Sequence, residues 1–287
     1  LQFIDDNKTK PFFMYYSSIL PHAELLVPDD AIFQAERAKF GNETPYLGKK
    51  NGEGKDYGDN LIVKEYTTQK YPHATFVAMV KRLDQHVGEL MSKLKELGIE
   101  KNTVILFSSD NGPHDEGGAD PEFFNCNSFL KGIKRDVYEG GIRVPMIVKW
   151  PAKVKAGSKT EHVSAFWDVM PTLAEIVQVK TPKESDGISF LPTLVGKNQK
   201  QHDFLYWEFH EKNASQAVRF GQWKGIRQNS PDLKNAPIEL YDLSSDVGEE
   251  KNIANNHPDI VAKIAKIMKD SHIENERFQF DYEIKKL

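Results

Sequence analysis

The stretch that decides the fold is VILFSSDNG, residues 104–112, in which an unbroken apolar run leads directly into small and polar residues. Unbroken apolar runs are typical of strands in a sheet that is covered on both faces, hence of a parallel α/β sheet. Two further runs have the same texture, PFFMYY at 11–16 and VPMIV at 144–148. We therefore expect three buried strands, with Asp110 and Asn111 at the carboxyl end of one of them, where open α/β sheets bind ligands.

Helical periodicity follows two of these runs. Apolar residues from Phe76 to Leu97 recur at three- and four-residue spacing, and Gly98 is a typical helix C-terminal stop. A second helix is expected from about Phe166 to Val177. The order strand, helix, strand, loop, strand, helix predicts a doubly wound α/β sheet.

The texture of the sequence changes twice more. Residues 31–71 are polar and rich in glycine, which favours a long surface excursion. After residue 196, the segments 216–226 and 238–243 resemble short antiparallel strands, and Pro258 opens an amphipathic helix. We predict a large α/β domain over residues 1–196 and a small α+β subdomain over residues 197–287.

Composition excludes several classes of protein. The chain has 287 residues, with 38 Lys and Arg against 42 Asp and Glu, for a net charge of −4. This mild acidity argues against a nucleic-acid-binding protein. The single cysteine, Cys126, excludes an intrachain disulfide and a cysteine-cluster zinc site. No apolar run reaches the roughly 18–20 residues of a membrane span.

Four residues are candidates for chemistry. Asp110 and Asn111 offer oxygens to a hard cation such as Ca²⁺ or Mg²⁺, although Asp-Asn-Gly is also ordinary turn chemistry. Lys134 precedes YEGGIRVP, residues 138–145, and is a point charge suited to an oxyanion, or else a solvated surface charge. His22 follows the first apolar run and could donate a proton to a leaving group, or be an ordinary hydrogen-bonded histidine.

Weaker candidates stand beside aromatic residues. His114 and Asp115 follow the SDNG segment, and Glu208 and His210 lie in YWEFH at 206–210. These polar groups are candidates for the lining of a sugar pocket, with ordinary surface roles as the alternative.

The order of these pieces resembles the formylglycine-dependent sulfatases. The resemblance rests on PFFMYY followed by Pro21-His22, on SDNG, on Lys134 four residues before YEGGIRVP, and on ELYDL at 239–243. It implies an alkaline-phosphatase-like fold with a small C-terminal subdomain. It also implies that Asp110 and Asn111 are calcium ligands, that Lys134 holds a sulfate oxygen, and that His22 contacts the sulfate or its bridging oxygen as a general acid.

One departure concerns the nucleophile, which in this family is a formylglycine made from Cys or Ser within C/S-x-P/A-x-R. Cys126 lies in NCNSF and fails this signature, and we take the signature to be absent. The signature and two aspartate metal ligands normally precede the PFFMYY segment. The chain therefore resembles the C-terminal portion of a sulfatase, and we expect a missing N-terminal segment of the same protein, without which these residues aggregate.

Coordination arithmetic agrees with an incomplete site. Calcium takes about 6–8 oxygen ligands. Asp110 and Asn111 provide only about three side-chain oxygens even when the carboxylate is bidentate. The other ligands must come from substrate, from water or from residues outside this sequence.

The predicted function is hydrolysis of a sulfate ester, on a sulfated carbohydrate or an aryl sulfate, with Ca²⁺ (Mg²⁺ as the alternative) and formylglycine as cofactors. Two alternatives remain open: a phosphatase or phosphodiesterase of the same superfamily, and a non-catalytic module that binds sulfated glycans. The expected partners are a sulfated small molecule or glycan and the missing segment, with no nucleic acid and no membrane span. Family resemblance places the protein in the periplasm or outside the cell.

Overall fold

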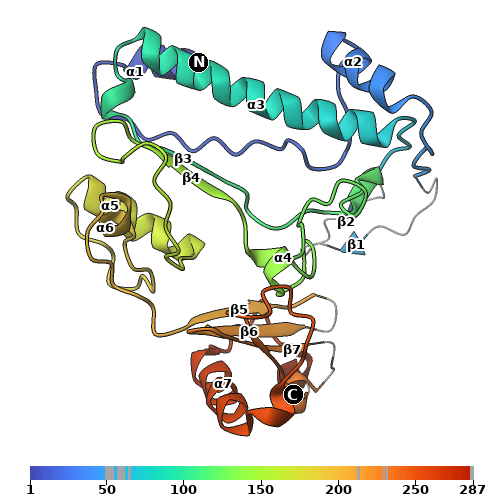
Figure 1. Cartoon of the computed structure of the whole chain (residues 1–287), viewed down its shortest axis with the longest axis vertical. Coiled ribbons are helices and arrows are strands. Elements are labelled where there is room, and N and C mark those ends of the chain that lie inside the picture. Colours follow the sequence, from blue (N-terminus) through green and yellow to red (C-terminus); the bar gives the residue numbers. More distant parts are fainter. Residues whose placement is uncertain are drawn as a thin grey trace. The chain divides into compact units, whose positions relative to one another are not determined.

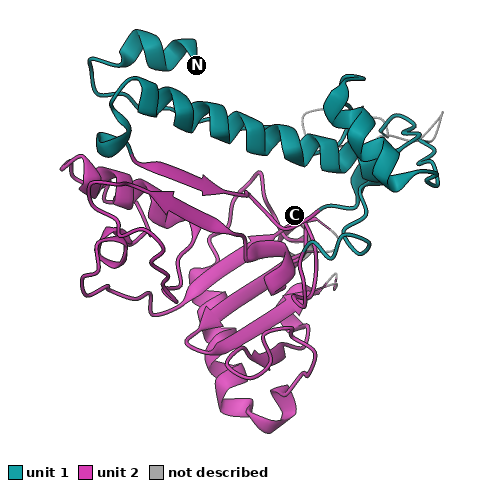
Figure 2. Cartoon of the chain, turned by 45° about the horizontal axis from the view of Figure 1, so that its top comes forward, with its two compact units in different colours: residues 1–103, 114–126 teal, residues 104–113, 127–287 magenta. Residues whose placement is uncertain are grey.

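The computed structural model describes residues 1–48, 66–211, 214–228, 230 and 232–284, and residues 55–56 and 62–63 by their backbone. The chain forms two compact units, one from residues 1–103 and 114–126, the other from residues 104–113 and 127–287 (Figure 2). The predicted excursion at 31–71 lies partly outside the described residues. The predicted boundary at residue 196 stays a prediction.

A 25-residue helix dominates unit 1. Helix α3 runs from Pro72 to Glu96, with Gly98 at a φ of 71° just beyond its end, as the sequence predicts (Figure 1). Its N-terminal part buries Ala74, Ala78 and Met79. The remaining elements of this unit are α1 (Gln2–Asn7), α2 (Ala31–Phe40), β1 (Lys55–Asp56), β2 (Ile62–Val63) and two short 3₁₀ turns (Glu100–Asn102 and Glu116–Gly118).

Helix α2 forms because Asp30 caps it. The Asp30 carboxylate accepts hydrogen bonds from the backbone N–H groups of Ile32 and Phe33, which satisfies two otherwise unpaired donors of the first turn. One face of α2 contacts α3, where the buried Glu36 binds Lys39 and Lys81. The hydrogen bonds from these two lysines lower the pKa of Glu36.

The prediction of a buried strand at residues 11–16 is wrong for the described structure. These residues have no strand pairing, and Phe13 and Tyr15 are 70% and 81% exposed. The apolar pattern indicates that these residues favour burial. A strand also needs a neighbouring strand whose backbone pairs with its N–H and C=O groups. No described strand provides that neighbour.

Two of the predicted strands are present in unit 2. Strand β3 (Ile105–Ser108) pairs with β4 (Met146–Lys149), with Phe107 opposite Ile147. The pairing is antiparallel, so the parallel arrangement expected for these two runs is wrong. An unbroken apolar run indicates burial on both faces, but it carries no information on the direction of the neighbouring strand.

The predicted second helix is confirmed. It consists of a 3₁₀ turn (Phe166–Asp168) that continues into α5 (Val169–Ile176). The buried Asp168 accepts hydrogen bonds from the backbone N–H groups of Ala165 and Ile188, and it also binds the His202 ring at 2.8 Å. A single carboxylate therefore fixes the start of this helix and the segment that leads to α6 (Leu191–Leu194).

The C-terminal part of unit 2 is an antiparallel sheet in the order β5-β6-β7-β8, covered by α7 (Figure 1). Ile264 and Met268 of α7 are fully buried against the sheet, and at Gly225 an added Cβ would lie 2.6 Å from Ile264. The strands β6, β7 and β8 and helix α7 follow the sequence expectation. The bounds are β5 (Leu205–Phe209), β6 (Ser215–Phe220), β7 (Trp223–Gln228), β8 (Glu239–Asp242), α7 (Pro258–Ser271) and α8 (Asp281–Ile284), with short 3₁₀ turns at Leu233–Asn235 and Ala254–Asn256.

Candidate active site

Asp110 and Asn111 begin the loop that leaves β3. The Asn111 side-chain nitrogen donates to the Asp110 carboxylate at 2.6 Å, so the two polar side chains converge on one point. The loop is held from both ends: the Ser108 hydroxyl donates to the Pro145 carbonyl, and the Ser109 hydroxyl donates to the Asn111 carbonyl. The polar end of the strand is thus a fixed loop.

Lys134 is attached to the same loop through its backbone. Its N–H donates to the Pro113 carbonyl at 2.7 Å, three residues beyond Asp110. The structure therefore brings the carboxylate, the amide and the lysine of the sequence prediction into one group of loops in unit 2.

Helix α4 (Glu139–Ile142) joins these loops. The Gly112 N–H donates to the Gly141 carbonyl at 2.8 Å, and the Gly140 N–H donates to the Lys131 carbonyl at 2.7 Å. A Cβ on Gly140 would lie 2.2 Å from the Gly132 carbonyl oxygen, and one on Gly112 would lie 2.0 Å from the Gly140 carbonyl oxygen. Only glycine permits this backbone contact, which explains the paired glycines of YEGGIRVP.

A buried ion cluster fixes the start of α4. The Lys224 ammonium, fully buried on β7, lies 2.8 Å from Glu139 and 3.5 Å from Glu249. Arg219 and Arg143 lie 3.5 and 3.7 Å from the other Glu139 oxygen. Burial raises the pKa of Glu139, but the charge and hydrogen bond of Lys224, together with the charges of Arg219 and Arg143, outweigh burial and leave that pKa lowered.

The pKa of Glu249 is shifted in the opposite direction. It accepts a hydrogen bond from the Glu139 backbone N–H at 2.7 Å, and burial raises its pKa in spite of Lys224. Sequence reasoning missed this cluster, although two signals were present: a glutamate beside two glycines, and Lys224 inside the otherwise apolar WKGI of residues 223–226.

A second anchor lies next to the cluster. The hydroxyls of Tyr138 and Tyr241 both donate to the Glu239 carboxylate at 2.6 Å. Burial and this bonded carboxylate raise the pKa of both phenols, so both stay protonated donors. The Lys131 ammonium lies 4.1 Å above the Tyr138 ring. The C-terminal sheet therefore holds the segment that carries Lys134.

His22 lies in unit 1 and is 43% exposed at its side chain. Its Nε2 is 3.4 Å from the Glu116 carboxylate, and its ring stacks on the His114 ring at 5.0 Å. The Glu116 N–H donates to His114 Nδ1, and Nε2 of the same ring lies 3.2 Å from the Pro21 carbonyl. Both ring nitrogens of His114 are therefore engaged by the backbone. His114 contacts His22 as a packing partner.

The donor set fits a hard cation in part. Carboxylate and amide oxygens are the ligands that calcium prefers. The atom 2.6 Å from the Asp110 carboxylate is the Asn111 amide nitrogen, which donates a hydrogen bond and cannot bind a cation. Within the described residues, no group of three or more His, Cys, Asp or Glu side chains is placed to hold a metal ion. Asp110 and Asn111 as calcium ligands therefore stay a prediction.

The sequence does contain one stretch with the letters of the nucleophile signature. Ser215-Gln216-Ala217-Val218-Arg219 satisfies S-x-A-x-R, so the expectation that the signature is absent is wrong by its letters. These residues form β6, where Ser215 is only 6% exposed and Arg219 binds Glu139. A residue paired inside a sheet offers no exposed turn for a nucleophile, so β6 has a structural role.

Glu208 and His210 are engaged with each other and with the C-terminus. Glu208 binds His210 at 3.1 Å and His272 at 2.6 Å, and the other nitrogen of His272 binds Glu283 at 2.6 Å. The His210 ring stacks on Phe280 at 4.2 Å. These residues join β5 to α8 and form an internal network, so the structure gives no support to their role in a sugar pocket.

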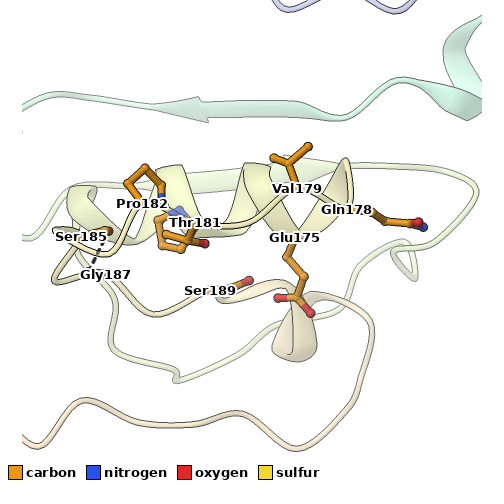
Figure 3. A pocket seen from close by; sticks show the side chains of 9 residues that line it. Glu175, Gln178, Val179, Thr181, Pro182, Ser185, Gly187 and Ser189 are labelled. Carbon is orange, nitrogen blue, oxygen red and sulfur yellow. Dashed lines mark hydrogen bonds between the residues drawn. The ribbon is translucent and has the colours of Figure 1, made fainter.

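One hollow of about 640 Å³ lies beside α5 (Figure 3). It is lined by α5 and the following segment to Ser189, and Glu175 is the one ionisable group among its described lining residues. It contains none of the residues that the sequence predicts for the site, and we assign no chemistry to it.

Among the part of the chain that the structure describes, no helix is both long and apolar enough to cross a bilayer.

The solved structures that this chain resembles define its class, an alkaline-phosphatase-like α/β protein. The family model "Sulfatase" matches residues 1–179, and the model "N-sulphoglucosamine sulphohydrolase, C-terminal" matches residues 132–277. The chain belongs to the sulfatase family.

Relatives and solved structures agree with this membership. The chain is 32% identical over 208 residues to the N-acetylgalactosamine-6-O-sulfatase of Bacteroides thetaiotaomicron, which covers 66% of this chain and 40% of that protein. It is 28% identical over 272 residues to human arylsulfatase A, covering 86% and 45%. The crystal structure of Ps i-CgsB in complex with k-i-k-neocarrahexaose matches with a TM-score of 0.71 at 26% identity, over 98% of this chain and 54% of that one.

The likeness to Ps i-CgsB confirms the expected α/β fold. The chain spans less than half the length of the two curated relatives named above.

Proposed function

We propose that this chain is part of a sulfuric ester hydrolase that releases inorganic sulfate from a sulfated carbohydrate. The observation that carries the proposal is the joining of the Asp110–Asn111 loop to Lys134 through the Pro113 carbonyl and helix α4. In the proposal, the Asp110–Asn111 loop supplies a cation site and Lys134 supplies an ammonium group to one tetrahedral anion.

In the proposed mechanism, Lys134 binds a sulfuryl oxygen and stabilises the charge that develops there. His22 donates a proton to the bridging oxygen, because a sugar alkoxide is a poor leaving group. The ring of His114 and the carboxylate of Glu116 hold the His22 imidazole in place. Asp110 and Asn111 are the proposed ligands of a calcium ion, which when bound supplies positive charge at the sulfate.

The nucleophile of this proposal is a formylglycine in sequence that precedes Leu1 in the gene. Support comes from two facts: Cys126 fails the signature, and Ser215 of the one matching stretch lies in a buried strand. The coding sequence before Leu1 tests this directly, since it must contain C/S-x-P/A-x-R and two aspartates. Membership of the family also favours a protein that is located in the periplasm or outside the cell. A signal peptide encoded in that same preceding sequence would support this location.

The substitution His22→Ala tests the role of His22 as general acid. The protein for this assay is expressed together with any coding sequence that precedes Leu1. We expect a loss of about 10²–10⁴-fold on a sugar sulfate, and a much smaller loss on an activated aryl sulfate whose leaving group needs no proton. Equal losses on both substrates would remove this role from His22.

Lys134→Ala tests the oxyanion role. Because the ammonium acts on the sulfuryl group common to both substrates, both rates should fall by about 10²-fold or more. An unchanged rate would remove Lys134 from the site. Hydrolysis of aryl phosphate in preference to aryl sulfate would favour a phosphatase, and retained binding of sulfated glycan without turnover would favour a binding module.

A further inference from the structure

A second hollow of about 640 Å³ lies in unit 1, beside the N-terminus of α3. Its volume falls within the range of small-molecule sites, roughly 300–1,000 Å³. None of the roles proposed above for Asp110, Asn111, Lys134 or His22 uses its residues. Its described lining includes Glu43, His73, Asp115, Asp120 and Phe123.

One lining residue of this hollow is an aromatic ring that is held by its neighbours. Phe123 is 57% exposed, yet its ring stacks on the His73 imidazole at 4.1 Å and 18°. The Phe124 ring meets it edge-on at 4.9 Å. An aromatic ring that is exposed on one face and held on the other offers a rigid apolar platform, and binding to it costs little side-chain entropy.

Carboxylates stand around this platform. One Asp120 oxygen accepts the Phe123 backbone N–H at 2.9 Å, and the other lies 3.3 Å from His73 Nε2. The Asp120 side chain is 43% exposed and each carboxylate oxygen can accept a second hydrogen bond. Asp115 is exposed in the same lining.

Glu43, by contrast, is already in use. Its two oxygens accept the backbone N–H groups of His73 and Ala74, at the start of α3, and its side chain is 3% exposed. It adds negative charge to the wall while the helix N-terminus is already capped. The wall therefore disfavours an anionic ligand.

The hollow is connected to His22 through the chain. Asp115, which lines the hollow, directly follows His114, and the His114 ring stacks on the His22 ring. The hollow and the proposed proton donor therefore belong to the same unit.

We infer that this hollow binds a neutral pyranose ring of the substrate, next to the sugar that carries the sulfate ester. The C–H face of the pyranose packs on Phe123, and its hydroxyls donate to Asp120 and Asp115. The carboxylates exclude a ring that carries a further sulfate or carboxylate, which makes this site a determinant of specificity. The assignment to the substrate rests on the proposed function; the binding of a neutral sugar does not.

Methyl β-D-glucopyranoside and methyl β-D-glucuronopyranoside are matched probes, since they differ only in a carboxylate at C6 and neither carries sulfate. Binding is measured by NMR titration of the purified protein, expressed with any sequence that precedes Leu1. We expect the glucoside to bind with a Kd of about 1 mM, as is typical of a ligand of this size, and the glucuronoside to bind at least about tenfold more weakly.

Variants separate the contribution of the Phe123 ring to sugar binding from that of the Asp115 and Asp120 carboxylates. Phe123→Ala should weaken glucoside binding at least about tenfold, while Phe123→Tyr keeps it. Phe129→Ala removes a phenylalanine that is 67% exposed outside the hollow and should leave the affinity unchanged. Replacing Asp115 and Asp120 together by Asn should bring the two glycosides to within about twofold of each other.

Three results would overturn the inference: no glucoside binding at about tenfold the expected Kd, equal binding by wild type and Phe123→Ala, or tighter binding of tetramethylammonium than of the glucoside. The last would show a cation site. Because no probe carries sulfate, a failure of the sulfatase proposal appears separately, in the assays of Lys134→Ala and His22→Ala.

Discussion

Replacing Lys224 by methionine removes the central charge of the buried cluster while keeping a side chain of similar length. In the wild type, its ammonium lies 2.8 Å from Glu139 and 3.5 Å from Glu249. After the substitution Glu139 still has two arginines within 3.7 Å. The Glu249 carboxylate keeps only the Glu139 backbone N–H among its described hydrogen bonds, and its other oxygen, Oε1, accepts none.

The magnitude follows from this asymmetry. Removing one partner of a buried ion pair costs about 3–5 kcal/mol of unfolding free energy. The arginines protect Glu139, and Glu249 can take up a proton because burial raises its pKa. We therefore expect a loss near the lower limit, about 3 kcal/mol. In a domain of this size that corresponds to a fall in Tm of about 6–12 °C.

The loss should depend on pH with a definite sign. A carboxyl whose pKa is higher in the folded than in the unfolded state binds more protons when folded, so its effect on stability becomes less favourable as pH rises between the two values. Without Lys224 the pKa of Glu249 rises further. The Lys224→Met deficit should therefore be smaller at acid pH and larger at alkaline pH.

Urea denaturation and calorimetry of the purified protein across pH measure this. Lys269→Met, on the exposed face of α7, is the control and should change stability by less than about 0.5 kcal/mol. Adding Glu249→Gln to Lys224→Met removes the orphaned charge and should restore part of the loss. A deficit that is the same at every pH, or a double variant no more stable than the single one, would refute this electrostatic account.

The other predictions concern a histidine and two glycines. Burial lowers the pKa of His272, but the hydrogen bonds that its ring donates to Glu283 and Glu208, together with their charges, outweigh burial and leave that pKa raised. The stabilisation by His272 is therefore complete below about pH 6.5 and is lost as pH rises through the folded pKa. His272→Gln should cost about 1–3 kcal/mol more at pH 6 than at pH 9 in urea denaturation, and a pH-independent cost would contradict this. Gly140→Ala places a Cβ 2.2 Å from the Gly132 carbonyl oxygen and should lower both the Tm and the affinity for inorganic sulfate. Gly88→Ala on α3 is the control, because a Cβ there meets nothing within 4 Å, and it should raise stability by about 0.5–1 kcal/mol. Similar effects of these two alanine substitutions would remove the packing argument for α4.

Local chemistry in the sequence predicts several parts of this protein well. The periodic run from Phe76 to Leu97 and the glycine after it define α3, because amphipathic spacing and a C-terminal glycine act within one helix. The antiparallel strands β6–β8 and helix α7 follow from patterns of the same range. The order of the short motifs predicted membership of the sulfatase family, and the family model confirms it over residues 1–179.

The directions and partners of strands were not available from such patterns. The run at residues 11–16 is as apolar as β3, yet its side chains are exposed, and β4 runs antiparallel to β3. An apolar residue gains free energy when it is buried, and the sequence shows which residues are apolar. Which strand pairs with it depends on contacts between residues that are far apart in the chain.

The sequence by itself determined which residue types stand at the strand-end loops: a carboxylate and an amide after an apolar strand, and a lysine before a pair of glycines. Only the tertiary structure decided how they are held. Glu139 meets Lys224 across 85 residues, and Gly112 reaches Gly141 by a backbone hydrogen bond. The physical reason is that a buried charge requires a partner and an unpaired backbone group requires a donor or acceptor, and the fold alone chooses which distant residue provides it.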